Sequence, residues 1–306
     1  MKNILIITSS FDLTSDYLIN RFGNMATFFR FNTDFFGEYL IDIRNLKGWN
    51  ISSQYWTLNE QDVFSIYYRK PTLPKLDNYE SKYHGLMYKD MISTIDGILE
   101  VFNGRCLSKP SILRKSENKI YQLRIAEEIG FDMPESLITN SKDSAYKFCS
   151  NKNMIVKPLS MGKLSFENRV GIIQTNLVNK EIAVDDLEHS TTYFQEYIPK
   201  DYEVRVTIVN GNCHAVRIDA KEKVDWRKSD NENIYSETSL PKDIKEKCFL
   251  MLRKLELNFG AFDFIVQNGK FVFLEVNPNG QWYWLEEKLN LDISDDIFAF
   301  LSGGDF

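Results

Sequence analysis

The sequence predicts an α/β protein with α+β subdomains, and three observations support this prediction. At 306 residues, the chain exceeds what one ordinary hydrophobic core supports, so we expect two or three subdomains that share interfaces. Its 43% hydrophobic and 26% charged residues are typical of a soluble globular enzyme. Short β-rich runs alternate with amphipathic segments along the chain, which indicates sheets covered by helices.

Residues 1–108 form the first predicted domain, a small N-terminal α/β domain. We expect a helix after Thr14 and a longer one from Asn78 to Phe102, with Pro71 and Pro74 ahead of the longer helix. The expected strands are Asn3–Thr8, Ala26–Phe31, Tyr39–Arg44 and Val63–Tyr68.

Residues 109–195 form the second, central predicted subdomain. It begins with a helix over Lys115–Ile129, where Ser116 can cap the start and Gly130 follows the end in the usual place for a C-cap. The further expected elements are strand Ser136–Thr139, helix Ser141–Cys149 and strands Met154–Pro158, Gly171–Thr175 and Thr192–Tyr197.

Residues 196–306 form the third, C-terminal predicted subdomain. A hairpin of Glu203–Val209 and His214–Ala220 turns at Asn210-Gly211-Asn212, and an irregular polar stretch follows from Lys221 to Glu237. The remaining expected elements are helix Pro241–Leu257, a second hairpin of Ala261–Val266 and Phe271–Val276, and a helix near Ile293–Leu301.

Composition excludes several classes of function. A net charge of −6 without a basic cluster argues against nucleic acid, and no segment is typical of a membrane span or a signal peptide. The four cysteines are scattered singly, which fits a reduced cytoplasmic compartment. With only three histidines, none in a ligand-like pair, catalysis must use carboxylates, lysines and arginines.

The most informative stretch is residues 261–284, which places Asp263, Glu275 and Asn277 on two adjacent strands among apolar residues. Two carboxylates and an amide oxygen form an all-oxygen set suited to Mg²⁺. The alternative is that all three are merely exposed strand positions. Glu275 and Asn277 are two residues apart and share a face, so the pattern favours a metal site.

The register of this second hairpin decides whether the metal site can form. If Asn268-Gly269 were a simple two-residue loop in a regular hairpin, Asp263 would lie opposite Leu274 and the carboxylates would face opposite sides. We therefore expect an odd-length turn or a bulge, for example a three-residue loop Gln267–Gly269 with Gly269 left-handed.

A strand Asp followed about a dozen residues later by Glu-x-Asn resembles the Mg-ATP site of the ATP-grasp family. The resemblance implies an ATP-grasp fold, with an N-terminal pre-grasp domain, a central domain and a C-terminal grasp domain, that uses ATP and two Mg²⁺ ions. Lys119 and Lys157 match the two family lysines that contact nucleotide phosphates. The hinge Gln195, Glu196, Tyr197 and Ile198 would reach the adenine through the backbone of Glu196 and Ile198, and Glu203 joins the nucleotide set.

Residues 160–163 stand where the family has a glycine-rich loop over the phosphates, which implies nucleotide contacts from Gly162 and Lys163. This loop has only one glycine, so it departs from the richest version of the motif.

Arginines complete the predicted site. Arg205 and Arg217 lie on the two strands of the first hairpin, and we expect both on the nucleotide face as donors to a γ-phosphate or an acyl phosphate. Two arginines on a solvated sheet face are the alternative. In the irregular segment, Asp225 is a candidate general base and Arg227 a candidate substrate contact.

Within the ATP-grasp family, the chain is most similar to the maturases of graspetides, the microviridin-type peptides. The resemblance rests on Tyr68–Pro71, Tyr202–Val206, Asp225–Arg227 and Phe273–Trp282. Tyr-Arg-Lys-Pro departs modestly from an aromatic-Arg-Arg-Pro pattern, which leaves the role of Arg69 open.

The resemblance implies a ribosomal precursor peptide as substrate, with a leader bound away from the active site and an acidic core containing Thr, Ser or Lys. It also implies ester or amide cross-links and a homodimer. The alternatives are another ATP-grasp carboxylate–amine ligase, such as a glutamate ligase, or a nucleotide-binding module that has lost turnover.

Overall fold

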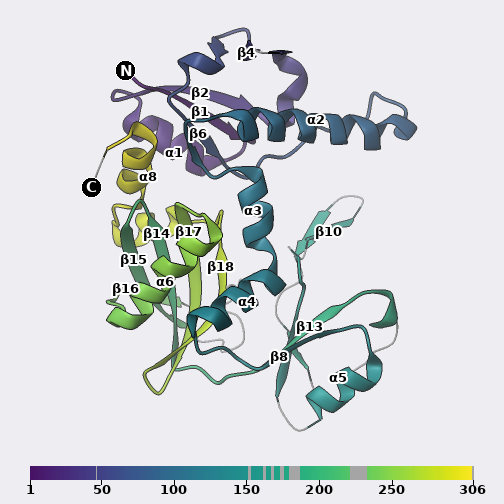
Figure 1. Ribbon diagram of the computed structural model, residues 1–306, viewed down its shortest axis with the longest axis vertical. Helices are drawn as coiled ribbons and strands as arrows, with labels where there is room; N and C mark the ends of the chain where they lie inside the picture. The colour runs from purple at the N-terminus through teal and green to yellow at the C-terminus, as the bar shows by residue number, and fades with distance from the viewer. Residues whose placement is uncertain are drawn as a thin grey trace.

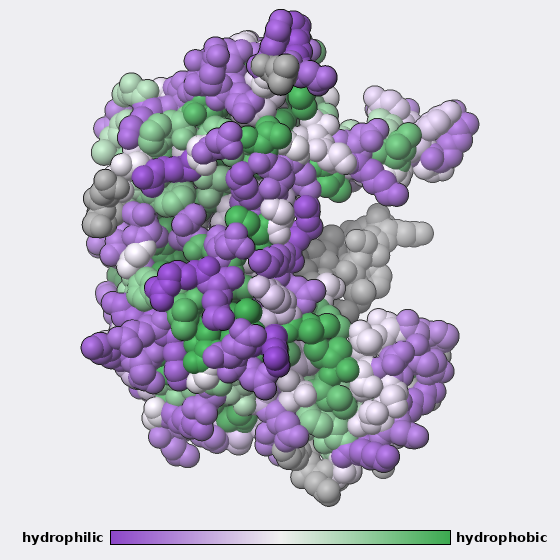
Figure 2. Space-filling model, in the orientation of Figure 1, coloured by the Kyte–Doolittle hydropathy of each residue, from purple (hydrophilic) through white to green (hydrophobic). Residues whose placement is uncertain are grey.

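The computed structural model describes residues 1–45, 47–150, 153–160, 163–166, 169–172, 176–178, 187–220 and 233–304, with only the main chain of residues 163–166 and 169–172. Three groups of elements are visible in Figure 1. An α/β layer that contains the N-terminus lies above a five-stranded sheet, and a smaller group around β8, β13 and α5 lies to the lower right. Figure 2 shows the molecule hollowed on the side where α2 projects above this smaller group.

The first group is built on a parallel sheet in the order β2-β1-β6-β7, as expected for an α/β domain. Its strands are β1 (Asn3–Thr8), β2 (Thr27–Asn32), β6 (Ser65–Tyr68) and β7 (Arg105–Leu107), with helices α1 (Leu13–Phe22) and α2 (Ser81–Val101). A separate antiparallel sheet contains β3 (Leu40–Arg44), β4 (Gly48–Ser52) and β5 (Thr57–Asn59), flanked by short 3₁₀ helices η1 (Thr33–Glu38) and η2 (Glu60–Asp62). The sequence did not predict β4, β5 or β7.

The central group has a sheet in the order β12-β9-β13-β8. Its elements are β8 (Ser136–Thr139), α5 (Lys142–Cys149), β9 (Met154–Lys157), β12 (Asn176–Val178), η3 (Leu187–His189) and β13 (Thr192–Glu196). A hairpin of β10 (Lys163–Phe166) and β11 (Arg169–Ile172) forms its own two-stranded sheet. Residues 163–166 therefore form a strand that the sequence did not predict.

The C-terminal sheet has the order β16-β15-β14-β17-β18 and is antiparallel throughout. Its strands are β14 (Tyr202–Val209), β15 (Asn212–Ala220), β16 (Asn233–Glu237), β17 (Phe259–Gln267) and β18 (Lys270–Asn277). The accompanying helices are α6 (Lys242–Leu255), α7 (Tyr283–Leu289) and α8 (Ile293–Ser302). None of the described helices has the length and apolarity that a membrane crossing requires.

The first and last groups share one hydrophobic core, which fixes the first group over the C-terminal sheet. Ile4 and Leu18 from the first group lie in the same buried cluster as Trp282 and Ile297. In this cluster Phe22 of α1 stacks on Phe298 of α8, with ring centroids 4.3 Å apart. The N-terminus and α8 lie on the same side of the molecule (Figure 1).

The helix expected over Lys115–Ile129 is two helices, α3 (Pro110–Glu117) and α4 (Lys119–Ile129). Asn118 separates them, since its side chain caps α4 by accepting a hydrogen bond from the Tyr121 N–H at 3.1 Å. The prediction that Ser116 caps this helix is therefore wrong, while Gly130 ends it with φ +81°, as expected. Both helices pack against β18 and α6. The division of the chain at residues 108/109 and 195/196 stays a prediction.

The hairpin of β17 and β18 confirms the expected irregularity but places it differently. Asn268 and Gly269 form a two-residue turn with φ +49° and +76°, the type I′ geometry, so the suggested three-residue loop is wrong. The correction comes from a bulge: Phe264 pairs with Phe273, but Asp263 pairs with Glu275. Leu274 is the extra residue, and it brings both carboxylates to the same face.

Replacing Asn118 by Ala should lower the free energy of unfolding by about 1 kcal/mol, because α4 loses its N-terminal cap. Urea unfolding followed by circular dichroism measures this change. Asn118→Asp is the matched control, since Asp is an equally good cap and should leave stability nearly unchanged. Equal losses in both variants would show that the cap does not stabilise α4.

Candidate functional site

Three oxygen-bearing side chains converge on one face of β17 and β18. Asn277 Nδ2 lies 3.0 Å from Asp263 Oδ2 and 3.4 Å from Glu275 Oε1. All three residues are half-buried. The predicted set therefore forms one cluster, which we call the oxygen triad.

Two cations compensate the charges of the oxygen triad. Arg205 Nη1, from β14, lies 2.8 Å from both carboxylate oxygens of Asp263, the residue directly opposite it in the sheet. Lys119 Nζ, from the first turn of α4, lies 2.5 Å from Glu275 Oε2. Because half-buried carboxylates are costly without such partners, these pairs explain how the sequence tolerates both acids here.

The oxygen triad has the donor chemistry that Mg²⁺ prefers: two carboxylates and an amide, with further ligands left to phosphate and water. An amide exchanges its oxygen and nitrogen by a 180° rotation, so Asn277 can offer its oxygen to a cation at the same place. No group of three His, Cys, Asp or Glu side chains in the described part of the chain could hold a metal, so a site here must use the Asn277 amide beside the two carboxylates. The oxygen triad is therefore the candidate metal centre.

Helix α4 is fastened to the strand that carries two of the triad residues. Gln122 donates its amide N–H groups to the carbonyls of Val276 and Ser116, at 2.8 and 2.6 Å, and accepts from the Val276 N–H at 3.1 Å. Lys119 is thereby held beside Glu275. Sequence reasoning did not single out Gln122, because a lone glutamine in a helix carries no signal of its function.

The predicted nucleotide residues of the central group lie on β9 and β13. Lys157 ends β9 and pairs with Tyr193, and the Gln195 amide donates to the Tyr193 hydroxyl at 2.9 Å. Burial raises the pKa of Tyr193 to about 12, and the Glu275 carboxylate adds to the shift, so the phenol stays protonated at neutral pH.

The predicted hinge, which follows β13, forms hydrogen bonds to the central group through part of its backbone. The N–H groups of Glu196 and Tyr197 donate to the carbonyls of Glu135 and Asn153, at 2.8 and 2.7 Å. These two N–H groups therefore hold the hinge to the central group. Ile198 follows them and is half-buried.

Glu203 lies two residues before Arg205 on the same face of β14, and its carboxylate forms an ion pair with Lys200. Both side chains are buried. Lys200 was not predicted from the sequence, since a lysine at the start of a strand is ordinarily a surface residue.

Arg217 does not lie where it was predicted. Arg205 is opposite Val216 and Arg217 is opposite Val204, so the two arginines project from opposite faces of the sheet. The Arg217 guanidinium stacks 3.8 Å above the Tyr202 ring and makes two hydrogen bonds of 2.7 Å to Asp219. The prediction that both arginines share the nucleotide face is therefore wrong. Successive side chains of a strand point to opposite faces, so the pairing of β14 with β15 decides the face of each arginine, and the prediction did not take this pairing into account.

Several predicted residues lie outside the described residues. Gly162, Asp225 and Arg227 are among them. Lys163 is described by its main chain as the first residue of β10, opposite Ile172. The roles assigned to these four residues stay predictions.

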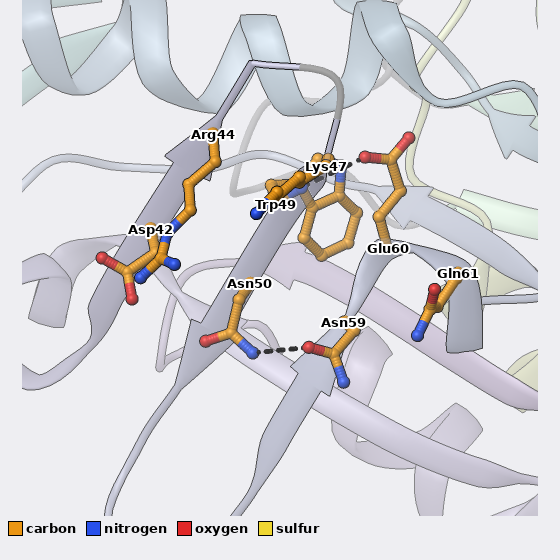
Figure 3. A pocket seen from close by; sticks show the side chains of 9 residues that line it. Asp42, Arg44, Lys47, Trp49, Asn50, Asn59, Glu60 and Gln61 are labelled. Atoms are coloured by element: carbon orange, nitrogen blue, oxygen red, sulfur yellow. Dashed lines mark hydrogen bonds between the residues drawn. The ribbon is translucent and has the colours of Figure 1, made fainter.

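A surface cavity of about 510 Å³ lies away from the oxygen triad, on the small sheet of β3, β4 and β5 (Figure 3). Among its lining residues, Asn50 Nδ2 on β4 donates to Asn59 Oδ1 on β5 at 2.9 Å, and the Glu60 carboxylate accepts from the Trp49 N–H at 3.2 Å. All lining residues come from residues 42–61, and none is a predicted site residue.

Of the comparisons with known proteins, the one with solved structures found similar proteins. No protein-family model matches the chain, and no curated protein sequence matches it. Among solved structures, a RiPP-associated ATP-grasp ligase of Chryseobacterium gregarium, in complex with ADP and a leader and core peptide, has a TM-score of 0.89 at 26% identity, covering 99% of this chain and 97% of that one. This chain has the ATP-grasp fold.

Two further ATP-grasp neighbours come from Microcystis aeruginosa. The macrocyclase MdnC, bound with precursor peptide MdnA, has a TM-score of 0.88 at 27% identity, covering 98% and 99% of the two chains. The macrocyclase MdnB has a TM-score of 0.83 at 28% identity, with the same coverage. A D-alanine–D-alanine ligase of Bacillus anthracis has a TM-score of 0.60 at 15% identity, which shows the ATP-grasp fold alone.

Removing the cation beside Asp263 should destabilise this ATP-grasp chain more than removing the exposed one. Arg205→Met leaves the half-buried Asp263 carboxylate without its cation and should cost about 3 kcal/mol. Arg217→Met is the matched control, because its ion pair with Asp219 is well exposed and should cost about 1 kcal/mol or less. Urea unfolding of both variants measures the difference, and equal losses would contradict the assignment of Arg205 to a buried pair.

Proposed function

We propose that this chain is an ATP-dependent carboxylate ligase that matures a ribosomal precursor peptide. It activates Asp or Glu side chains of the peptide as acyl phosphates and joins them within the same peptide as esters or amides. The observation that carries the proposal is the oxygen triad with Arg205 and Lys119 beside it. The similarity of the whole chain to ligases and macrocyclases solved with precursor peptides supports the choice of substrate.

In the first step, an oxygen of the substrate carboxylate attacks the γ-phosphorus of ATP, and ADP leaves. Lys119 and Lys157 would offset the charge of the phosphates, as their places at the start of α4 and the end of β9 allow. Arg205 fixes the position of the Asp263 carboxylate through its two hydrogen bonds. When bound between Asp263, Glu275 and Asn277, Mg²⁺ would supply the neutralising charge that phosphoryl transfer requires.

In the second step, a hydroxyl or amine of the peptide attacks the acyl carbon, a C–O or C–N bond forms, and inorganic phosphate leaves. The attacking group loses a proton, and we assign Asp225 as the base that takes it and Arg227 as a substrate contact. Arg217 pairs with Asp219 on the other face of the sheet, so we assign it no part in this step.

The proposal extends to partners and location. We propose a homodimer in the cytoplasm, with the leader of the peptide bound away from the oxygen triad. The scattered single cysteines, all of which are free, support a reducing compartment.

Mass spectrometry of an acidic, Thr-rich precursor peptide incubated with the enzyme, ATP and Mg²⁺ tests this function. We expect successive losses of about 18 Da, one water for each new bond, that require ATP and occur within one peptide. ADP release without water loss, or a gain of mass from added amino acids, would contradict the macrocyclase assignment and favour a general carboxylate–amine ligase.

A further inference from the structure

A fully buried arginine lies between the first group and the loop that follows the oxygen triad. Arg69, just after β6, has no exposed surface. It pairs with Asp12 at 3.2 Å and donates to the Thr14 hydroxyl at 3.2 Å and to Gln281 Oε1. The mechanism above does not use this charge, although burying it is costly unless it is fully paired.

Arg69 determines which way the Gln281 amide is turned. A guanidinium carries only donors, so the group that it contacts on Gln281 must be the oxygen. The Thr14 hydroxyl accepts from Arg69, and its own proton is donated to the same Gln281 oxygen at 3.3 Å. The NH₂ end of the amide is therefore turned away from Arg69, and Gln281 is an exposed residue.

Gln281 also lies beside the oxygen triad. Its main-chain carbonyl accepts from Arg205 Nη2 at 3.5 Å, and Arg205 holds Asp263 through its other nitrogen. The preceding residue, Gly280, is packed so closely that an added Cβ would lie 2.7 Å from Arg205 Nη2 and 3.3 Å from Asn277 Cβ. The loop after β18 is therefore packed directly against Arg205 and Asn277.

A purely structural tie between the two groups is already present at the next residue. Trp282 is fully buried and donates its indole N–H to the Tyr67 hydroxyl at 3.2 Å. Such a tie does not require a second, exposed side chain whose NH₂ group is turned away from the buried contacts. The buried contacts use only the oxygen of the Gln281 amide, so its NH₂ group is left to contact a ligand.

We propose that the Gln281 amide donates a hydrogen bond to the substrate carboxyl group as it becomes an acyl phosphate, and that Arg69 is the positioning residue that holds the amide in this orientation. This inference rests on the proposed function. The amide N–H is a neutral donor, so without a proton transfer it can bind the carboxyl oxygen that does not attack phosphorus, which becomes the carbonyl oxygen of the acyl phosphate.

The variant Gln281→Glu tests the donor directly. Glutamate has the same shape and still accepts from Arg69 and Thr14, so the buried contacts remain, but its outward oxygen cannot donate and repels a carboxylate. Acyl phosphate formation, trapped with hydroxylamine as a hydroxamate, should fall roughly 10- to 100-fold in kcat/KM for the carboxylate substrate. The affinity for Mg-ADP, measured by calorimetry, should stay within about twofold of the wild type.

Gln54→Glu is the matched control, since it makes the same change at an exposed position between β4 and β5. This control should leave kcat/KM for hydroxamate formation and the affinity for Mg-ADP within about twofold of the wild type. Arg69→Met should also lower hydroxamate formation, because the amide is then free to rotate. A Gln281→Glu enzyme that keeps wild-type kcat/KM, or that loses Mg-ADP affinity to the same degree as kcat/KM, would overturn the assignment.

Failure of this inference can be told apart from failure of the proposed function. If the wild type forms hydroxamate from a small carboxylate but from no acidic peptide, the peptide function is wrong, and loss of that activity in Gln281→Glu still supports the donor. If the wild type forms hydroxamate from no carboxylate, both proposals are overturned.

Discussion

The site depends on two carboxylates reaching the same face of one hairpin. A two-residue turn at Asn268-Gly269 would place Asp263 and Glu275 on opposite faces, and the bulge at Leu274 corrects this. Once the carboxylates meet, they need cations, and the structure supplies one from β14 and one from α4. The bulge in β18 therefore creates the need for the cations that β14 and α4 supply.

Those distant segments are held by specific hydrogen bonds. Gln122 fastens α4 to β18 through both ends of its amide, which keeps Lys119 within reach of Glu275. On the other side, Arg69 and Trp282 connect the first group to the loop after the triad. The charges of Lys119 and Arg69 are tolerated because each is paired, so loss of one partner should disturb the oxygen triad and also lower stability.

Much of this could be read from the sequence, because strands, turns and the residues of the oxygen triad have local signals. The sequence also required a bulge or an odd turn, since parity alone decides the face of Asp263, but it could not say that Leu274 is the extra residue. It failed for Arg217, whose face depends on pairing with a neighbouring strand. It could not find the contact of Arg69 with Gln281, which joins residues 212 positions apart.

The central claim is that Glu275 belongs to a Mg²⁺-dependent nucleotide site, and calorimetry of ADP binding with and without Mg²⁺ tests it most directly. For the wild type, Mg²⁺ should strengthen ADP binding, and in Glu275→Gln this gain should fall at least about tenfold while the melting temperature is kept. Glu287→Gln, the same change at an exposed position of α7, should retain the full gain. An undiminished effect of Mg²⁺ in Glu275→Gln would contradict the metal assignment.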